Sequence, residues 1–203
     1  MKRLAILGAS GHGKVVADAA QLSGWNEVVF FDDAWPDLHI NSHWPVVGNT
    51  LTLLSQVRDV DGVIVAIGNN SIRLEKLTML SDFGLSLVTI IHPQAVVSPY
   101  SKIGVGSIVC AGAVVSADAC IGMGVILNTG CSVDHDCLLA DAVHISPGAR
   151  LAGGVGVERC AWIGIGSVVR QQLTVGESAI VGAGAVVVKN VLKNTVVKGI
   201  PAQ

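Results

Sequence analysis

The chain has 203 residues, of which 51% are hydrophobic and 14% are charged, and its formal net charge is −2. So small a charge gives no electrostatic reason to expect binding to nucleic acid or to an anionic membrane. The apolar run after Met-Lys-Arg is interrupted by Gly8 and Gly11, so it is too short for a signal peptide or a membrane span. We therefore expect a large buried core, no membrane insertion and, by default, a cytoplasmic location.

The first ninety residues alternate between apolar runs typical of strands and stretches typical of helices. This alternation favours a parallel sheet, and it predicts a small Rossmann-like α/β domain over residues 1–90. Residues 34–48 carry prolines and tryptophans near each other and are interpreted as a loop. The predicted strands are 3–7, 27–31, 62–67 and 85–90, and the predicted helices are 14–22 and 71–82, the second capped by Ser71.

Small and polar residues follow three of the predicted strands. The first cluster, Gly8-Ala-Ser-Gly-His-Gly13, opens a helix, and its small side chains let backbone N–H groups approach a phosphate. The carboxyl ends of parallel strands meet at one edge of the sheet, where open α/β sheets bind ligands. We therefore predict a nucleotide site at this edge, although each residue taken singly also fits an ordinary turn. The residues assigned to the site are Ser10, Gly11, His12, Asp32, Asp33 and Gly68.

A different pattern begins at Ile91, because every sixth residue from there to Val187 is aliphatic without a break. A period of six fits neither a helix nor a simple strand. It is typical of a parallel β-helix built from hexapeptides, three to each triangular coil. The residue four places after each aliphatic one is mostly small and is also expected to face inward. We predict a left-handed parallel β-helix over residues 91–203, an architecture used chiefly by acyltransferases.

Glycine and cysteine occupy particular places in these repeats. Cys131 and Cys137 stand at the small inward position, so we interpret them as core thiols rather than catalytic or metal-binding groups. Glycine often follows the aliphatic residue, where we expect the coil corners to need unusual backbone angles. These glycines are Gly104, Gly122, Gly164, Gly176 and Gly182.

Histidine is uncommon in such repeats, so His135 and His144 are candidates for chemistry. His135 is expected to point outward near a corner, and it lies between two carboxylates, Asp134 and Asp136. A carboxylate that binds one imidazole nitrogen fixes the tautomer and raises the basicity of the other nitrogen, as a general base requires. His144 is assigned either to contact with an acyl donor or to a structural hydrogen bond. Asn128 fits a donor contact and a corner hydrogen bond equally well.

Several motifs of the chain recur together in one known family. They are the loop of residues 8–13, Phe31-Asp-Asp33, Ala66-Ile-Gly-Asn-Asn-Ser-Ile-Arg73, Val125-Ile-Leu-Asn-Thr129 leading to Asp-His-Asp-Cys137, and Gly-Ile-Pro-Ala near the C-terminus. On these motifs the sequence resembles, over essentially its whole length, the NeuD/PglD-type nucleotide-sugar acetyltransferases of the hexapeptide-repeat superfamily. It is most similar to the branch that acetylates UDP-4-amino sugars in bacillosamine synthesis. The resemblance implies a homotrimer with active sites between neighbouring β-helices.

The resemblance also implies a reaction and a set of residue assignments. An acetyl group would pass directly from acetyl-CoA to the amino group of a UDP-linked amino sugar, and no metal would take part. His135 would accept the proton, and Asp136 would raise its basicity. The strand-end residues of the first domain would hold the UDP-sugar. The residues implied to contact acetyl-CoA are Asn128, His144, Ile165 and Ala183.

Three other functions are compatible with parts of the sequence. O-acetylation of a sugar of the sialic-acid type uses the same architecture, and only the nucleotide-contacting motifs favour N-acetylation over it. A non-enzymatic nucleotide-binding scaffold would leave the Asp-His-Asp cluster unexplained. A zinc hydratase of the γ-carbonic-anhydrase kind needs three imidazoles around one metal, whereas only His135 and His144 lie in the central repeats.

Overall fold

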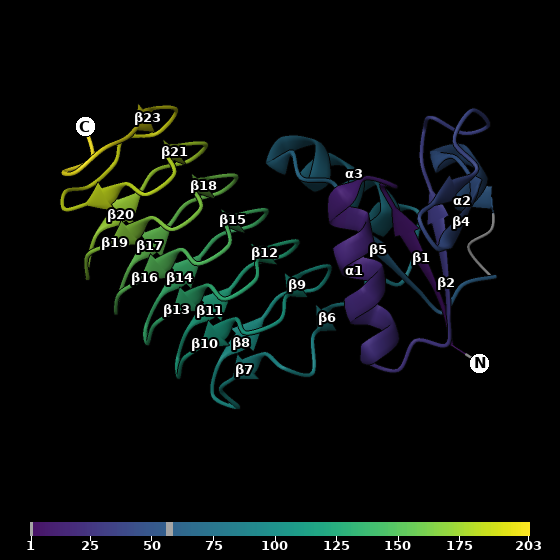
Figure 1. The fold of residues 1–203 in the computed structure, drawn as a ribbon, viewed down its shortest axis with the longest axis horizontal. Helices are drawn as coiled ribbons and strands as arrows, with labels where there is room; N and C mark the ends of the chain where they lie inside the picture. The colour runs from purple at the N-terminus through teal and green to yellow at the C-terminus, as the bar shows by residue number, and fades with distance from the viewer. Residues whose placement is uncertain (1, 56–58) are drawn as a thin grey trace. The chain divides into compact units, whose positions relative to one another are not determined.

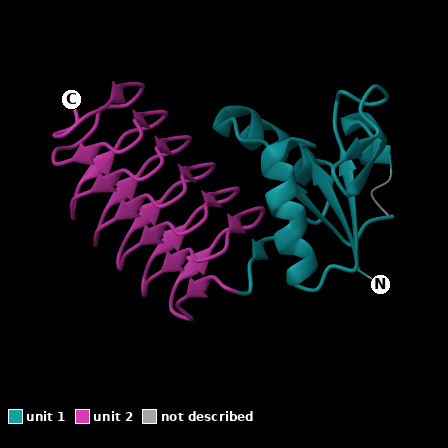
Figure 2. Ribbon diagram, in the orientation of Figure 1, with its two compact units in different colours: residues 1–93 teal, residues 94–203 magenta. Residues whose placement is uncertain are grey.

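A computed structural model describes residues 2–55 and 59–203 of the chain (Figure 1). The chain divides into two compact units, Met1–Pro93 and Gln94–Gln203 (Figure 2). The first unit is built from helices and a mostly parallel sheet, and the second is a left-handed parallel β-helix. The predicted fold class is therefore confirmed.

The first unit has one sheet with the strand order β3-β4-β2-β1-β5. β1 pairs in parallel with β2 and β5, and β4 pairs in parallel with β2. The central strands are buried, and Ile6, Phe30 and Ile64 have no exposed surface. The elements are β1 (Arg3–Leu7), α1 (Gly11–Leu22), β2 (Glu27–Phe31), β3 (Ile40–Asn41), β4 (Trp44–Gly48), α2 (Thr50–Ser55), β5 (Gly62–Val65), α3 (Asn70–Asp82) and β6 (Ile90–Ile91).

Two predicted segments of this unit are partly wrong. Residues 34–39 are irregular as predicted, but the rest of 34–48 is not a loop, because β3 and β4 form an antiparallel hairpin there and β4 joins the sheet. Pro45 is tolerated in β4 because it precedes Val46, where the ladder with β2 begins, and the Val46 amide donates the bond to β3 at the His39 carbonyl. Of the strand predicted over 85–90, the structure has only an isolated bridge between Val63 and Leu87 and, at Ile90, the first residue of β6.

The helix boundaries also differ from the predicted ones. α1 begins at Gly11, before the predicted start, so the glycine-rich loop itself provides the first helical turn. The N-cap of α3 is Asn69 rather than Ser71, because the Asn69 side chain accepts a hydrogen bond from the Ile72 amide at 3.1 Å.

The second unit consists of two-residue strands at six-residue intervals along most of its length (Figure 1). Each strand pairs in parallel with the strand one coil on, as Val115 does with Val133, so that a coil contains 18 residues or three hexapeptides. We name the three faces of the coil by their strands. Face 1 holds β7 (Val96–Val97), β10 (Val114–Val115), β13 (Ser132–Val133), β16 (Arg150–Leu151), β19 (Val168–Val169) and β22 (Val186–Val187); face 2 holds β8 (Lys102–Ile103), β11 (Cys120–Ile121), β14 (Leu138–Leu139), β17 (Gly156–Val157) and β20 (Thr174–Val175); face 3 holds β9 (Ile108–Val109), β12 (Ile126–Leu127), β15 (His144–Ile145), β18 (Trp162–Ile163), β21 (Ile180–Val181) and β23 (Val196–Val197).

The core of the β-helix contains the two inward positions that the sequence predicts. Aliphatic residues such as Val133 and Ile163 are fully buried, and so are small residues such as Ala113. Cys131 and Cys137 are buried in the same core, which confirms the interpretation of both as core thiols. Burial raises the pKa of Cys131 to about 12, so this thiol is not a nucleophile at neutral pH.

The glycines that follow the aliphatic residues have a different cause from the one predicted. A Cβ at Gly104 would lie 2.5 Å from the Gly122 carbonyl, and one at Gly176 would lie 2.5 Å from the Lys193 amide nitrogen. These positions therefore lack a side chain because the next coil passes too close. The left-handed backbone angles occur elsewhere in each corner, for example at Gly154 and at Asp136, which has a φ of 59°.

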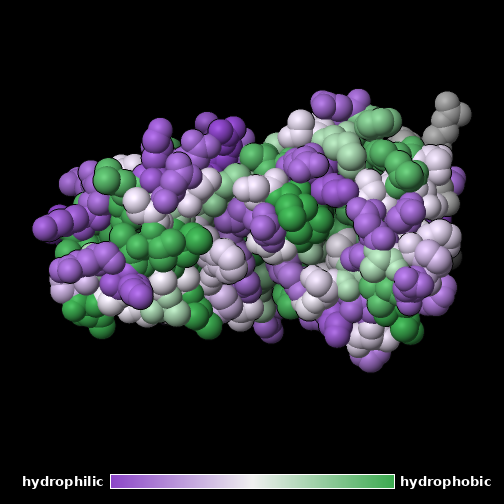
Figure 3. Space-filling view, turned by 90° about the horizontal axis from the view of Figure 1, so that it is seen from above, coloured by the Kyte–Doolittle hydropathy of each residue, from purple (hydrophilic) through white to green (hydrophobic). Residues whose placement is uncertain are grey.

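The outward positions of the β-helix are often hydrophobic. Figure 3 shows hydrophobic residues as green areas on the surface of this unit, among purple polar residues. Such flat faces provide area for a ligand or for another protein surface. The outward residues with substantial exposure are Val96, Leu138, Trp162, Val168, Ile180 and Val196.

Candidate active site

The first unit has a cavity of about 290 Å³ at the carboxyl edge of its sheet. Four of the six residues predicted for a nucleotide site line this cavity. They are Ser10, Asp32, Asp33 and Gly68. Lys76, on α3, lines it as well and was not predicted. No sequence motif marks Lys76, because its place depends on how α3 packs against the sheet. The remaining lining residues are Leu7, Gly8, Ile67 and Ile72.

The two aspartates of this cavity are held differently. Asp32 accepts hydrogen bonds from the amides of Ala9 at 2.7 Å and Ala34 at 2.9 Å, so its carboxylate fixes the glycine-rich loop. Asp33 accepts one hydrogen bond from the Thr50 amide at 2.9 Å and another from Lys76 Nζ at 3.1 Å. Partial burial raises the pKa of Asp33, but the hydrogen bonds from Thr50 and Lys76 outweigh it and lower the pKa overall.

The other two predicted residues, Gly11 and His12, are not among the residues that line this cavity. Gly11 is exposed in the first turn of α1. Burial, together with the positive charge of Arg73, lowers the pKa of His12 to about 4. Within the described part of the chain, His12 Nε2 is buried and has no hydrogen-bond partner. His12 is therefore neutral at ordinary pH and adds no charge for a phosphate.

A buried arginine shapes the loop that carries Gly68. Arg73 is 1% exposed and donates through Nη1 to the carbonyl of Ile67 at 2.8 Å. Its Nη2 donates to Asn70 Oδ1 at 2.8 Å. These bonds hold the β5–α3 connection against the helix, so the backbone at Gly68 stands at a fixed place on the cavity wall.

His135 and Asp136 lie at the corner between face 1 and face 2 of the β-helix. They line a cavity of about 250 Å³ together with Gly153, Gly154, Gln171 and Gln172. His135 Nδ1 donates to Asp136 Oδ2 at 2.7 Å, so Nε2 is the nitrogen left to accept a proton. The hydrogen bond to Asp136 raises the pKa of His135 above its ordinary value, and the charges of Asp136 and Asp134 add to this effect. The pair thus has the arrangement of a general base and its orienting acid.

Gly153 provides the space in which the His135 ring lies. A Cβ at position 153 would be 2.5 Å from both Cε1 and Nε2 of that ring. Gly153 was not predicted, although the sequence contains a signal that identifies it. A coil has 18 residues, so the positions beside 135 on the following coils are 153 and 171.

Face 3 carries a separate groove of about 450 Å³ that three of the predicted donor-site residues line, His144, Ile165 and Ala183. The fourth, Asn128, does not line the groove, but its Nδ2 lies 3.3 Å from His144 Nε2. Trp162, one coil beyond His144, was not predicted, although the same 18-residue step leads to it. The remaining lining residues are Ser146, Pro147, Gly164, Ile180, Val181 and Gly182.

The structure does not bring His135 and His144 together within one chain. His135 follows β13 of face 1, whereas His144 begins β15 on face 3. The candidate base and the candidate donor groove therefore stand at different places around the coil.

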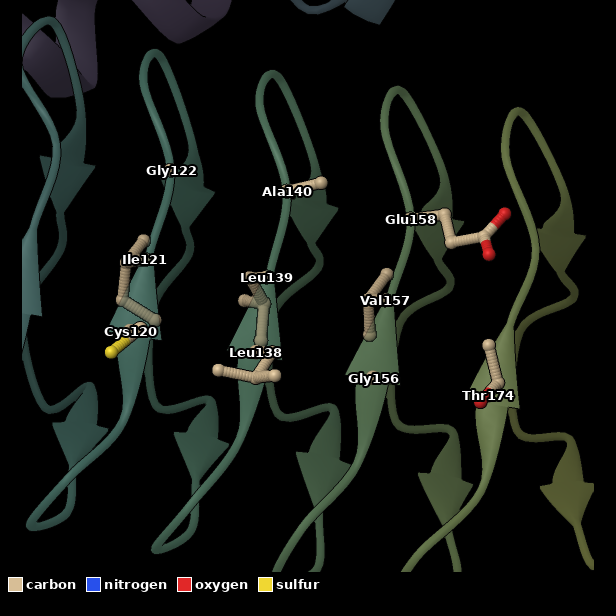
Figure 4. Close-up of a pocket in the computed structure, with 10 residues that line it drawn as sticks. All are labelled: Cys120, Ile121, Gly122, Leu138, Leu139, Ala140, Gly156, Val157, Glu158 and Thr174. Atoms are coloured by element: carbon tan, nitrogen blue, oxygen red, sulfur yellow. The ribbon is translucent and has the colours of Figure 1, made fainter.

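Another groove, of about 510 Å³, lies on face 2 (Figure 4). Leu138 and Cys120 project from its apolar floor, and Glu158 stands at one side. No residue predicted for the active site lines it. Among the residues that the structure describes, no three His, Cys, Asp or Glu side chains are grouped so as to hold a metal ion. None of the described helices is long and apolar enough to cross a membrane.

The comparisons with known sequences point to one family. Residues 3–80 match the family model described as the PglD N-terminal domain. Over 114 residues the chain is 35% identical to the UDP-N-acetylbacillosamine N-acetyltransferase of Bacillus subtilis (strain 168), and the match covers 55% of this chain and 52% of that protein. The matched stretch thus spans about half the length of that curated relative.

Solved structures match the whole chain. The acetyltransferase domain of PglB from Neisseria gonorrhoeae FA1090, in complex with acetyl coenzyme A, is 45% identical with a TM-score of 0.95, covering 100% of this chain and 98% of that one. A variant of perosamine N-acetyltransferase from Caulobacter crescentus, in complex with CoA and GDP-perosamine, is 39% identical with a TM-score of 0.95, covering 100% and 96%.

A hexapeptide β-helix with an outward His–Asp pair and a separate apolar groove defines the class of hexapeptide-repeat acyltransferases. The match over both units narrows the assignment further. This chain belongs to the NeuD/PglD-type nucleotide-sugar acetyltransferases, which confirms the resemblance seen in its motifs.

Proposed function

We propose that the protein transfers an acetyl group from acetyl-CoA to the amino group of a nucleotide-linked sugar. The observation that carries the proposal is the exposed His135–Asp136 pair with its 2.7 Å hydrogen bond on an otherwise inert scaffold. The complexes of the relatives with acetyl coenzyme A and with GDP-perosamine support both substrate classes. A scaffold without activity would leave this pair without a function.

In the proposed reaction His135 acts as the general base. Its Nε2 removes a proton from the sugar amine while the amine nitrogen attacks the thioester carbonyl carbon. The C–S bond then breaks, and the proton on His135 neutralises the departing CoA thiolate, so that the products are an N-acetyl sugar and free CoA. Positioning of the two substrates supplies much of the rate, and the base contributes about 10²–10⁴-fold.

The acetyl donor is proposed to bind in the groove on face 3. His144, Ile165 and Ala183 line this groove, and Asn128 holds the ring of His144. The apolar lining suits the pantetheine arm, and the imidazole suits the polar thioester end. Because His135 lies elsewhere on the coil, we further propose a homotrimer in which His135 of one copy faces the groove of a neighbour. A monomer by light scattering at micromolar concentration would contradict this arrangement.

The acceptor nucleotide is proposed to bind in the cavity of the first unit. Ser10, Gly68 and the N-terminus of α1 offer backbone N–H groups for phosphates, and Lys76 offers a positive charge. Asp33 offers carboxylate oxygens for hydroxyl or base N–H groups. Gly11 and His12 are retained as proposed contacts on the adjoining turn of α1, His12 as a neutral hydrogen-bonding group.

We propose a UDP-linked 4-amino sugar as the acceptor. One relative is named for a UDP sugar and another is bound to a GDP sugar, so the nucleotide needs a direct experiment. UDP-, GDP- and dTDP-linked 4-amino sugars would each be incubated with acetyl-CoA while free thiol release is followed. Turnover with the UDP sugar alone supports the proposal. Preference for another nucleotide would correct it, and release only with a hydroxyl acceptor would indicate an O-acetyltransferase.

The division of substrates between the two units can be tested separately. A chain that begins at Gln94 retains the whole repeat core, which stabilises itself coil upon coil. Calorimetry should detect binding of acetyl-CoA to this chain and no binding of the UDP-sugar. Retained UDP-sugar affinity would contradict the nucleotide site assigned to the first unit.

A further inference from the structure

Trp162 covers the imidazole of His144. The two residues are register partners in β18 and β15, and their rings stack with centroids 5.1 Å apart and planes inclined by 15°. His144 is 8% exposed, whereas Trp162 is 40% exposed. One face of the indole therefore shields the histidine, and the rest of the indole forms wall of the face 3 groove.

The indole is also fixed at its edge. Trp162 Nε1 donates a hydrogen bond of 2.7 Å to Ser146 Oγ, and Ser146 is 4% exposed. Stacking alone would let the ring slide in its plane, and the hydrogen bond prevents this. Trp162 is thus held by His144 on its face and by Ser146 on its edge, and all three residues line the groove.

Asn128 determines which nitrogen of His144 carries the proton. Its Oδ1 accepts the Thr129 amide N–H at 2.8 Å, so its NH₂ group is the part that faces His144 Nε2, at 3.3 Å. Because an amide NH₂ is only a donor, this contact favours the neutral tautomer of His144 in which Nε2 accepts and Nδ1 carries the proton.

We propose that Trp162 is a positioning residue of the acetyl-donor site. It holds the His144 ring in the plane in which Nε2 faces the Asn128 NH₂ group, and it presents a flat, rigid surface to the acetyl-CoA chain. This inference rests on the donor groove of the proposed function. The inference goes beyond that function because it assigns part of the affinity for acetyl-CoA to Trp162, a side chain that does not react in the transfer.

The first test separates the stack from the hydrogen bond. Trp162→Ala removes both and should raise the KM for acetyl-CoA about tenfold, with a smaller change in kcat and none in the acceptor KM. Trp162→Phe keeps an aromatic face and should restore most of the donor affinity. Ser146→Ala frees only the edge of the indole, so its KM for acetyl-CoA should lie between those of Trp162→Ala and Trp162→Phe. Val168→Ala is the matched control. Val168 is 38% exposed in β19, the next strand along the chain after β18, and it lines none of the grooves described above.

The second test is spectroscopic and independent of turnover. The other tryptophans, Trp25, Trp35 and Trp44, lie in the first unit, so Trp162 is the single indole of the β-helix. Titration with CoA should quench the fluorescence of the wild-type protein, and this change should vanish in Trp162→Phe. Nitrogen-15 NMR of the histidine rings should show His144 unprotonated at Nε2 in the wild type and a mixture of tautomers in Trp162→Ala.

The outcomes distinguish this inference from the proposed function. Equal CoA affinity and equal KM in the wild type and in Trp162→Ala would overturn the inference while acetyl transfer stands. CoA binding that depends on Trp162, in a protein that acetylates none of the amino sugars, would support the inference and overturn the function. A wild-type protein that does not bind CoA at all would overturn the inference as well. The unfolding temperature of each variant would show whether a loss of acetyl-CoA affinity is caused by a loss of folding.

Discussion

His135 and His144 lie nine residues apart on one β-helix and have opposite surroundings. The side chain of His135 is 69% exposed, and a carboxylate bonds its Nδ1 and raises its pKa. His144 is buried under an indole, and an amide N–H₂ faces its Nε2. The comparison teaches that the partner of the ring, rather than the ring itself, decides the chemistry. A carboxylate favours a protonatable base, and an amide favours a neutral hydrogen-bonding group.

The same comparison holds for the backbone that carries each partner. Asp136 has a φ of 59°, a left-handed conformation that Asp and Asn adopt more readily than most residues. The corner thus turns the carboxylate back toward the preceding His135. Asn128 instead anchors its own oxygen on the next amide, at Thr129, which leaves its nitrogen for the histidine. In both places one short polar side chain orients one imidazole.

Removal of the proposed base should have the largest effect. His135→Ala is expected to lower kcat about 100-fold or more, because the amine then has no proton acceptor in place. Steady-state kinetics with both substrates would measure this, and the UDP-sugar affinity should stay nearly unchanged. His39→Ala, an exposed histidine of the first unit, is the control. Near wild-type turnover in His135→Ala would show that the base is assigned to the wrong residue.

The next effect in size concerns the space around that base. Gly153→Ala should lower kcat about tenfold, because the new Cβ would lie 2.5 Å from the His135 ring and force it aside. The unfolding temperature should change little, since His135 is exposed and free to move outward. Gly156→Ala is the matched control, as a Cβ there meets only Thr174 Oγ1 at 3.8 Å. If both variants retain full activity, the ring position is not critical.

A smaller effect is expected from Asp136→Asn, which makes the corner resemble the groove. Asn fits the left-handed backbone, so the substitution changes charge with little strain. The neutral partner no longer stabilises imidazolium, so the pKa of His135 should fall. Since the neutral ring is the active base, the acidic limb of the kcat profile should move to lower pH, and the plateau should drop several-fold. An unchanged pH profile would leave Asp136 as a corner residue only.

The sequence predicts the β-helix well because every coil obeys the same constraint. The aliphatic and small positions repeat as far as Val187, so each repeat supports the others. The hairpin of β3 and β4 was missed because it occurs once, at a sheet edge, among residues that favour turns. The reason for Gly104 and Gly176 was also missed, because the close approach of neighbouring coils leaves no local signature.

Sequence reasoning found the parts of the site that are adjacent in the chain. His135 and Asp136 are neighbours, so their pairing was visible before the structure. Gly153 and Trp162 come from the following coil and were missed, although the 18-residue coil length places 153 beside 135 and 162 beside 144. Lys76 had no such signal, since only the packing of α3 brings it to the cavity.

The smallest expected effect comes from the reverse exchange, Asn128→Asp, which makes the groove resemble the corner. One carboxylate oxygen would still accept the Thr129 amide, and the other would face His144 Nε2 in place of the NH₂ group. The proton on His144 should then move to Nε2, and the negative charge should raise the pKa of the ring. Because the Asn128 contact in the donor groove favours a neutral His144 ring, the KM for acetyl-CoA should rise a few-fold in the variant and should rise further as the pH falls through the raised pKa. The pKa of His144 should thus rise in Asn128→Asp, whereas that of His135 should fall in Asp136→Asn. A pH series of donor KM values for both variants would measure the difference. If the pH dependence of both variants moves in the same direction, the two histidines do not differ in the protonation state that function requires.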